Sequence, residues 1–550
     1  MLQRSDDGSM RTGPVPDLLD ISVAEHGARP ALNFMGRRWT YAQLGDLVDR
    51  TAAGLQRLGV QKGVKVGLCL PNTPYSVIFF FAILKAGGTV VNYSPLYVER
   101  ELRHQILDSG TTIMVVPDVK VMHSRVAAVA SEAGLKTVIV CPMRGILPWL
   151  KGILFQLFKR KDQAVFSADD GLHLKFSRLI EGAGRPKPVV IDAERDIAVL
   201  QYTGGTTGVP KGAMLTHANL TANAAQVITH VGCLRPEDER VLGVLPLFHV
   251  FAMTNVMNIP ISLGAEIILV PRFNLPDLLA TIAREKPTIF PGVPTIYTAI
   301  NNASGVTKDG LASLRLCISG GAPLPAEVRH TFEALSGCKL VEGYGLSETS
   351  PVLTANPPLG IIKDGSVGTA VPGTVLEIRD LADPHRMVAL GEKGEVCARG
   401  PQVMTGYWQR PEDTRNAFVD GAFRTGDVGY LDADGYLFLV DRIKDVILCG
   451  GFNVYPRVIE EALYLHPAVA EAVVIGIPDT YRGQSPKAFV TLRTDQTVTP
   501  PELLTFLTSQ VSKVEMPKAV EISDSLPKTL VGKLSKKELI AEEKLRHPTQ

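Results

Sequence analysis

Short apolar runs alternate with longer helical patterns in the first part of the chain. Residues 66–70 form a short apolar run, and residues 89–92 are rich in β-branched side chains; both patterns are typical of buried strands. Residues 75–86, between them, form a longer apolar stretch that predicts a helix, and Gly87 and Gly88 end it. The same unit recurs as a strand at 113–116, a helix at 119–133 and a strand at 137–141. This alternation predicts parallel sheets covered by helices.

The pattern changes in the later part of the chain. Residues 365–399 are rich in Gly and Val and in turn residues, which predicts a smaller β-rich subdomain. A predicted strand at 437–440 is followed by the charged segment DRIKD at 441–445 and then by a new αβ region. We therefore predict an α/β protein with a large N-terminal domain of parallel αβαβ sheets plus the β-rich subdomain, and a small α+β C-terminal domain. The predicted domains are 1–440 and 446–550, joined by a hinge at 441–445.

One uncharged segment, 241–265, is long enough to cross a membrane. Its polar residues and prolines include Pro246, His249, Asn255, Asn258 and Pro260. Such residues fit a buried segment that lines a site better than a helix that faces lipid. We therefore expect this segment to be buried inside the protein.

A second segment, RGILPWLKGILFQLFKRK at 144–161, has a helical spacing of apolar residues. These are Ile146, Trp149, Leu150, Ile153, Leu154, Leu157 and Phe158. Positive charges lie beside them, at Arg144, Lys151, Lys159, Arg160 and Lys161. The pattern fits a helix that lies in a membrane interface. It also fits a helix that packs on the protein's own core or at a subunit interface.

The overall composition narrows the class of protein. The chain has 550 residues, of which 45% are hydrophobic and 21% charged, as in ordinary globular proteins. Its formal net charge of +1 gives no reason to expect a nucleic-acid partner. Its 7 cysteines include no CxxC pair, which fits a reducing compartment without a disulfide framework or structural zinc. Residues 1–10 lack an apolar core, so we expect no signal peptide and a cytoplasmic location.

The strongest local motif is QYTGGTTGVPKG at 201–212, which follows the apolar run 197–200. Its glycines let backbone N–H groups approach a polyphosphate, and its threonine hydroxyls and Lys211 add donors and charge. It is not a Walker A loop, because Pro210 stands where that motif needs Gly. The motif therefore predicts a phosphate-binding loop, with a Gly/Thr-rich surface turn as the alternative.

Three further motifs are weak when taken singly. In EGYGLSETS at 342–350, Glu348 beside hydroxyls can hold Mg²⁺, and Tyr344 between glycines can stack on a base. In FRTGD at 423–427, Asp427 can accept the hydroxyls of a ribose. In PKTLVGKL at 527–534, Lys533 on a Gly-containing turn could reach a site on another domain. The alternatives are an ordinary loop, a turn aspartate and a solvated lysine.

Together and in this order, these motifs resemble the adenylate-forming acyl-activating superfamily, which includes acyl-CoA synthetases, luciferases and nonribosomal adenylation domains. The match runs from about residue 20 to residue 540. Within the superfamily the chain looks most like a bacterial long-chain fatty-acid–CoA ligase. Gly204 stands where the usual YTSGTTG loop has serine, and AMLTH at 213–217 and PLFHVF at 246–251 point the same way. The apolar character of 241–263 suits an acyl-binding wall.

The resemblance implies a reaction in two steps. A fatty acid carboxylate attacks the α-phosphate of ATP, with Mg²⁺ present, and gives an acyl-adenylate and pyrophosphate. The thiolate of CoA then displaces AMP to give the thioester. Between the steps the small C-terminal domain rotates, so that one site performs both reactions. The family also suggests a homodimer, and segment 144–161 suggests peripheral contact with the inner face of the cell membrane.

The resemblance also assigns residues to the phosphates, the metal and the chemistry. Those implied to hold the nucleotide phosphates are Thr203, Gly204, Gly205, Thr206, Thr207, Gly208 and Lys211. Glu348 and Thr206 are implied to bind Mg²⁺, and Ser347, where relatives often have Thr, to contact the α-phosphate. Lys533 is implied to bridge the carboxylate and the α-phosphate during adenylation. The predicted catalytic residues are Lys533, Thr206, Lys211, His249 and Glu348.

A second group of residues is implied to bind the nucleoside and CoA. Those implied around the adenine are Gly321, Ala322, Pro323, Glu342, Gly343, Tyr344 and Gly345. Asp427 is implied to take the ribose hydroxyls, Arg442 to support ribose and phosphate, and Lys444 to mark the hinge. Those implied to line the pantetheine path are Gly450, Gly451 and Phe452. His249 is implied to orient the acyl group or gate the tunnel, with a packed core histidine as the alternative.

Other functions share parts of this pattern. A medium-chain or aryl-acid CoA ligase would have the same nucleotide motifs. A fatty-acyl-AMP ligase would stop at the adenylate, and a luciferase-like oxygenase would use the same first step. A non-catalytic acyl- or nucleotide-binding homologue is a further alternative. The presence of Lys211, Glu348, Asp427 and Lys533 together argues against it.

Overall fold

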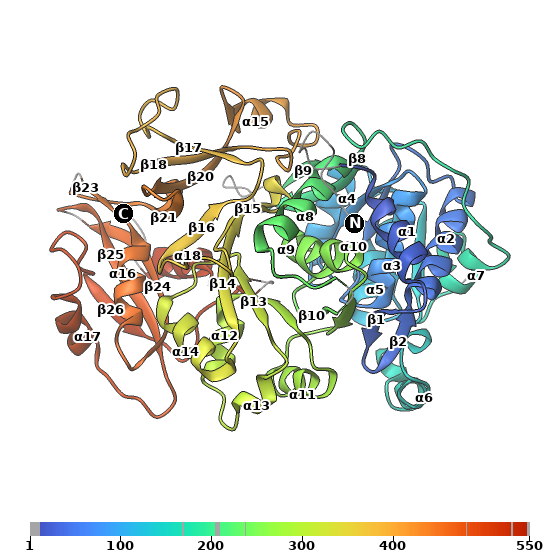
Figure 1. The fold of residues 1–550 in the computed structure, drawn as a ribbon, viewed down its shortest axis with the longest axis horizontal. Coiled ribbons are helices and arrows are strands. Elements are labelled where there is room, and N and C mark those ends of the chain that lie inside the picture. Colours follow the sequence, from blue (N-terminus) through green and yellow to red (C-terminus); the bar gives the residue numbers. More distant parts are fainter. Residues whose placement is uncertain are drawn as a thin grey trace.

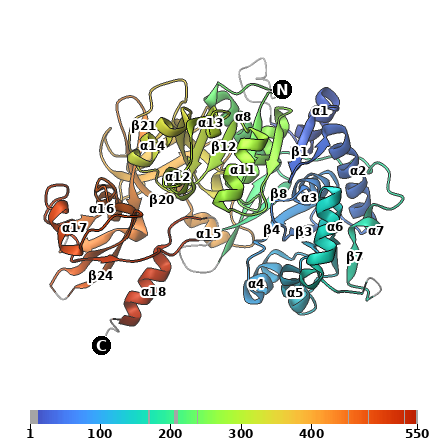
Figure 2. The same ribbon diagram turned by 90° about the horizontal axis from the view of Figure 1, so that it is seen from below.

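The computed structural model describes residues 12–167, 170–203, 210–236, 238–450, 452–479, 481–529 and 532–546. Within these residues the strands form three sheets with helices packed around them (Figure 1, Figure 2). The chain runs from the blue N-terminal part at one end of Figure 1 to the red C-terminal part at the other. The predicted α/β class, with a large N-terminal part and a small C-terminal part, is confirmed.

The first sheet is built from the predicted strand–helix units. Among the described residues its strands are, in spatial order, β7 (His173–Lys175), β6 (Thr137–Cys141), β5 (Ile113–Pro117), β3 (Lys65–Leu68), β4 (Thr89–Asn92), β8 (Ile197–Thr203) and β9 (Lys211–Thr216). The pairs are parallel except β8 with β9. The helices in this part are α2 (Tyr41–Arg57), α3 (Pro74–Lys85), α4 (Glu99–Ser109), α5 (Lys120–Ala130) and α7 (Phe176–Ile180). The predicted strands and helices between residues 66 and 141 are therefore confirmed, with ends that differ by a few residues.

The second sheet joins the parallel region and the β-rich region into one surface. Its strands among the described residues are, in order, β17 (Val375–Arg379), β18 (Gly394–Arg399), β20 (Ala422–Leu431), β21 (Tyr436–Arg442), β16 (Ser366–Ala370), β15 (Val352–Ala355), β14 (Lys339–Gly345), β13 (Leu316–Gly320), β12 (Ile289–Gly292), β10 (Arg240–Gly243), β11 (Glu266–Leu269), β1 (Pro30–Phe34) and β2 (Arg37–Thr40), with β19 (Phe418–Val419) beside β20. Strands β14 to β1 pair in parallel, and β14 to β17 pair antiparallel. The predicted β-rich region 365–399 supplies β16, β17 and β18, three strands of the antiparallel half, and shares this sheet with the parallel strands.

The helices of this second region connect its strands and pack on both large sheets. They are α1 (Val15–His26), α8 (His217–Val231), α11 (Leu275–Glu285), α12 (Pro294–Asn301), α13 (Lys308–Leu311), α14 (Ala326–Ser336) and α15 (Pro411–Asn416). Helix α8 begins at a capping box, in which the Thr216 hydroxyl accepts the amide of Asn219. It ends at Gly232, whose φ of +64° suits a residue without a side chain. These two signals set the ends of the helix, which forms part of the wall of the cavity described below.

The C-terminal part has its own small sheet. Its strands among the described residues are, in order, β23 (Phe452–Val454), β22 (Ile447–Cys449), β25 (Gly483–Leu492) and β24 (Val469–Asp479), with β26 (Ala519–Ile522) parallel to β25. Its helices are α16 (Pro456–Tyr464), α17 (Pro500–Leu507) and α18 (Lys536–Arg546). The segment η5 (Ile443–Asp445) leads into it from β21, where the sequence predicts the hinge.

The uncharged segment 241–265 is buried, as predicted. After β10 it forms the short helices α9 (Val250–Ala252), η3 (Met253–Asn258) and α10 (Ile259–Ser262), and then turns into β11. The side chains of η3 are all buried. Among the described residues, no helix combines the length and apolarity that crossing a membrane requires.

Helix α6 (Trp149–Phe158) is shorter than the predicted helical pattern at 144–161. Pro148 has an extended conformation and precedes the first turn, and a proline disfavours helix in the residue before it. Ile146 therefore lies in the preceding loop and is buried, rather than on the helix. The other apolar residues of the pattern are exposed, with Trp149 at 73% and Phe158 at 79%. Figure 1 shows α6 near β2, far from the C-terminal sheet.

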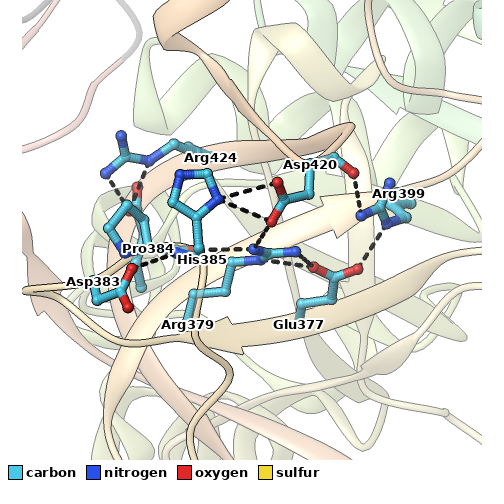
Figure 3. Close-up of polar contacts among 9 residues, drawn as sticks. Glu377, Arg379, Asp383, Pro384, His385, Arg399, Asp420 and Arg424 are labelled. Carbon is cyan, nitrogen blue, oxygen red and sulfur yellow. Dashed lines mark hydrogen bonds and ion pairs between the residues drawn. The ribbon is translucent and has the colours of Figure 1, made fainter.

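An ion network with a buried centre at Glu377 and Arg379 supports the antiparallel half of the second sheet (Figure 3). Arg379 on β17 is buried and donates to Glu377 at 2.8 Å and to Asp420 at 2.8 Å. Glu377 also accepts from Arg399 on β18 at 2.7 Å. Next to this network, Glu395 on β18 accepts from Arg424 at 2.7 Å. These bonds connect β17, β18 and β20, so they hold β20, the strand that carries Asp427.

We expect Arg379→Met to destabilise the protein, because it leaves the carboxylates of Glu377 and Asp420 without their shared cation. Breaking a buried pair costs about 3 kcal/mol of unfolding free energy, so the melting temperature should fall by several degrees. Arg386→Met is the control, because Arg386 pairs with Asp380 at an exposed position. Thermal unfolding of both variants by circular dichroism measures the effect. Equal melting temperatures for the two variants would contradict the structural role of Arg379.

Candidate functional site

A cavity of about 710 Å³ lies where the strands of the second sheet meet the C-terminal part. In parallel sheets, ligands bind beyond the carboxyl ends of the strands, and the residues after β13 and at the end of β14 lie there. The sequence-predicted residues that line it are Thr203, Lys211, His249, Gly321, Gly343, Tyr344, Gly345, Ser347, Glu348, Arg442, Lys444 and Lys533. The structure therefore brings together residues separated by more than half of the chain.

Glu348 is a buried carboxylate on the short segment η4 (Ser347–Thr349). Its Oε1 accepts a hydrogen bond from the Tyr407 hydroxyl at 2.8 Å, and Thr203 Oγ1 lies 3.5 Å away. Burial raises the pKa of Glu348 above its ordinary value. Both of these side-chain partners are hydroxyl groups, and a buried carboxylate beside hydroxyls suits a hard cation such as Mg²⁺.

Asp427 lies on β20 and is also buried. Its Oδ2 accepts a hydrogen bond from the Tyr344 hydroxyl at 2.6 Å, and Arg442 Nε lies 3.3 Å from its Oδ1. Burial raises the pKa of Asp427, and the guanidinium of Arg442 opposes that rise. Asp427 does not itself line the cavity, but both of its partners do. The arrangement can present acceptor oxygens and a cation to a polar ligand.

Two lysines bring positive charge to the cavity from different directions. Lys211 Nζ lies 2.5 Å from Asp413 Oδ1, near the ring of Tyr407. Lys533 lies against Gly321, where an added Cβ would come within 2.5 Å of the Lys533 side chain. Burial, and the nearby Arg442, lower the pKa of Lys533 to about 8. Glycine at 321 thus leaves the space that the lysine from the C-terminal part occupies.

His249 lines the cavity and also caps α9. Its Nδ1 accepts the amide of Phe251 at 3.3 Å. Burial, and the charge of Lys533, lower the pKa of His249 to about 3. The imidazole is therefore neutral near pH 7, with its Nδ1 used as an acceptor. Both earlier interpretations, a residue facing the substrate and a hydrogen-bonded core histidine, fit this position.

Several sequence-predicted residues lie outside the cavity wall. Glu342 is buried, accepts the amide of Leu324 at 3.1 Å, and has its pKa raised by burial to about 7. Ala322 and Pro323 precede Leu324 in the same loop and are not part of the wall. The residues Gly450 and Phe452 belong to the hairpin of β22 and β23, where Phe452 is exposed. Outside the described residues lie Gly204, Gly205, Thr206, Thr207, Gly208 and Gly451.

Other lining residues carry no sequence signal that we recognised. The Tyr407 hydroxyl donates to Glu348, and Asp413 accepts from Lys211. The two residues of each pair lie far apart in the sequence. Glu395 accepts the amide of Gly426 at 3.2 Å and so fixes the turn before Asp427. The apolar part of the wall includes Val227, Val231, Val341, Val352 and Ala355. Valines at these positions look like ordinary core residues in the sequence, so only their position reveals a ligand wall.

Comparison with known proteins gives consistent results over nearly the whole chain. The model of the AMP-binding enzyme family matches residues 19–408, and that of the AMP-binding enzyme C-terminal domain matches residues 458–533. The long-chain-fatty-acid–CoA ligase of Bacillus subtilis (strain 168) is 41% identical, over 96% of this chain and 94% of that protein. The ligase of the same name from Escherichia coli O157:H7 is 38% identical, over 95% and 93%.

Solved structures agree with these sequence matches. ATP-bound MatB from Rhodopseudomonas palustris superposes with a TM-score of 0.85 at 29% identity, covering 97% of this chain and 99% of that one. The anthranilate CoA ligase AuaEII in complex with anthranoyl-AMP has a TM-score of 0.86 at 28% identity, covering 98% of both chains. Both likenesses extend over the two parts of the chain that form the cavity.

Proposed function

The chain belongs to the AMP-binding enzyme family, and on that premise we propose that it ligates a long-chain fatty acid to CoA through an acyl-adenylate, releasing AMP and pyrophosphate. The observation that carries the proposal is the cavity itself. Cations of Lys211, Arg442 and Lys533 line it together with the buried carboxylate of Glu348, and Arg442 pairs with the buried Asp427 behind the wall. Aliphatic side chains such as Val227 and Val231 form another part of the wall. Such a cavity suits a reaction that joins a nucleotide phosphate to an apolar acid.

The polar groups of the cavity support the nucleotide assignment. Asp427, with Tyr344 and Arg442, would hold the ribose and the base, since a carboxylate can accept both ribose hydroxyls. Lys211 would leave Asp413 to contact the phosphates, together with the loop 204–208, whose role rests on the family resemblance. Ser347 would contact the α-phosphate, and Ala322, Pro323, Glu342, Gly343 and Gly345 would shape the adenine site.

Glu348 fits a magnesium ligand. It is a single buried carboxylate with hydroxyl neighbours, and Mg²⁺ in nucleotide sites is held by one or two carboxylates together with phosphates and waters. The ion would neutralise charge on the nucleotide phosphates. Thr206, the other proposed ligand, lies outside the described residues. The proposed ligands other than the acid are therefore ATP, Mg²⁺ and the co-substrate CoA.

The apolar wall favours an aliphatic acid. Val227 and Val231 of α8 face the cavity together with side chains of β14 and β15, and the relatives named long-chain-fatty-acid–CoA ligases are 35–41% identical. An aryl-acid ligase is the second candidate, because the anthranilate and benzoate CoA ligases share the fold at 28% and 25% identity. His249 would lie beside the acid in either case.

The CoA step would use a second arrangement of the C-terminal domain. We propose domains at 1–440 and 446–550 with the hinge at 441–445, because β21 ends in this segment and β22 begins a separate sheet. Rotation at Lys444 would withdraw Lys533 and bring the hairpin with Gly450, Gly451 and Phe452 toward the cavity. The family resemblance also suggests a homodimer. In such a dimer each subunit would complete this cycle on its own.

We further propose that α6 docks the protein on an anionic membrane surface, at the inner face of the cell membrane. Its apolar residues Trp149, Leu150, Leu154, Leu157 and Phe158 are exposed, and Lys159, Arg160 and Lys161 follow at its end. Exposed apolar side chains of this size gain free energy in the acyl boundary, while the cations contact anionic headgroups. Docking would place the enzyme where long-chain acids partition.

We expect acid-dependent AMP formation with long acids and CoA-dependent acyl-CoA formation from them. The measurement incubates the purified protein with Mg²⁺-ATP and acids from C4 to C20 plus aryl acids, with and without CoA, and quantifies AMP and acyl-CoA by mass spectrometry. Adenylates without thioesters would indicate a fatty-acyl-AMP ligase. Thioesters of aryl acids alone would favour the second candidate, and no AMP with any acid would indicate a binding protein.

We expect Lys533→Ala to lower acid-dependent AMP formation by about 100-fold or more, because it removes the buried cation at the reacting centre. CoA attack on supplied acyl-adenylate should stay near the wild-type rate. In the wild type, protonated Lys533 is lost as pH rises through about 8, so kcat/KM for ATP in adenylation should fall above that pH. Equal loss of both half-reactions in the variant would contradict the assignment.

We expect the triple variant Trp149→Ser, Leu150→Gln, Phe158→Gln to lose at least about tenfold in binding to vesicles that contain phosphatidylglycerol. Activity on soluble octanoate should be unchanged. Vesicle co-sedimentation and the activity assay test this, with high salt weakening wild-type binding because it screens the cations. The control is the double variant Leu359→Gln, Ile361→Gln. These two residues are 75% and 70% exposed and lie in a loop elsewhere in the chain. Parallel loss of binding and octanoate activity would indicate a folding role instead.

A further inference from the structure

The turn that carries Lys533 is closed by its own hydrogen bonds. The amide of Thr529 donates to the carbonyl of Lys533 at 2.6 Å, and the amide of Gly532 donates to the carbonyl of Thr529 at 2.9 Å. The amide of Lys533 donates to Thr529 Oγ1 at 3.1 Å. Gly532 has a φ of +82°, which suits glycine. These bonds link Thr529 to Gly532 and Lys533, but they do not fix the position of these residues relative to the cavity.

One hydrogen bond fixes that position across the domain boundary. Thr295 Oγ1 donates to the carbonyl oxygen of Gly532 at 2.7 Å. Thr295 is the second residue of α12, which follows β12 of the large sheet, and it is half-buried. The packing here is close, because a Cβ at Gly532 would lie 3.5 Å from Thr295 Oγ1 and 3.6 Å from the side chain of Val293.

The neighbouring threonine of the same helix shows that this bond is not a routine feature of α12. Thr298 is also half-buried, but its hydroxyl donates to the carbonyl of Pro294 in the same helix at 3.0 Å. Thr295 directs its hydroxyl out of the helix to the other domain. The two residues thus form a natural pair for comparison.

We propose that Thr295 is a positioning residue for the adenylation half-reaction. The carbonyl of Gly532 and the amide of Lys533 share one planar peptide unit, so a bond to the carbonyl holds the backbone nitrogen and the Cα of Lys533 in place. From this backbone position the side chain places its ammonium group against Gly321 in the cavity. The inference rests on the proposed role of Lys533 and adds the group that holds the lysine in place.

The bond is specific to the arrangement that the structure shows. When the C-terminal domain rotates, Lys533 and Gly532 leave together, so the Thr295 bond must break. The hydroxyl therefore stabilises the adenylate-forming arrangement alone. Its removal should slow the first half-reaction and leave the second unchanged or faster.

The test compares Thr295→Val, Thr295→Ser and the control Thr298→Val. Thr295→Val keeps the shape of the side chain and should lower kcat of acid-dependent AMP formation about 3- to 10-fold, the range expected for one neutral hydrogen bond. KM for ATP should be unchanged. CoA attack on supplied acyl-adenylate should not fall, Thr295→Ser should restore adenylation, and Thr298→Val should match the wild type.

The contrary outcomes are distinct. Equal loss of both half-reactions in Thr295→Val, no rescue by Ser, or the same loss in Thr298→Val would overturn the positioning role. Lys533→Ala is measured in the same assays. If that variant keeps full adenylation activity, the proposed function of Lys533 itself fails. If Lys533→Ala loses adenylation and Thr295→Val does not, only the present inference fails.

Discussion

The site depends on burying a cation of the C-terminal part in a cavity of the N-terminal part. Lys533 lies in that cavity with its pKa lowered by burial and by Arg442, so the docked ammonium is held at an electrostatic cost. An anionic ligand offsets that electrostatic cost, because its phosphates place negative charge beside the buried ammonium group. ATP should therefore stabilise the docked arrangement. In the proposed reaction, less negative charge remains once pyrophosphate has left, and the same cost would favour withdrawal of the lysine.

Two buried carboxylates, one in the cavity wall and one behind it, are held in the same way. Glu348 and Asp427 are both buried, and a tyrosine hydroxyl donates to each, from Tyr407 and from Tyr344 respectively. One oxygen of each carboxylate therefore has a hydrogen-bond donor without any ligand. In the proposed function, a ribose or a metal ion replaces or joins these interactions. The two carboxylates are thus held in place before a ligand binds.

Local sequence patterns predict most of the helices and strands, but they do not predict the long-range contacts. The strands at 89–92 and 137–141 have the expected bounds, because β-branched runs between turns specify buried strands almost alone. The helical spacing of apolar residues at 144–161 predicts too long a helix, because Pro148 disfavours a helical conformation in the residue before it. The bonds of Tyr407 and Thr295 could not be predicted, because each joins segments that only the folded sheet order brings together. The family motifs supplied the cations and carboxylates, but not the residues that hold them.

In the proposed cycle the contact between the two domains opens in every turnover, and a neutral hydrogen bond suits such a contact. A buried ion pair at Thr295 would cost about 3–5 kcal/mol when one partner leaves, because a charge would stay behind unpaired. A hydroxyl–carbonyl bond contributes only about 1 kcal/mol net, because water replaces either partner once the surfaces part. The Gly532 carbonyl and the half-buried Thr295 hydroxyl meet this requirement. The charge of the ligand can then decide which arrangement prevails, while the hydrogen bond decides how accurately Lys533 is placed within one of them.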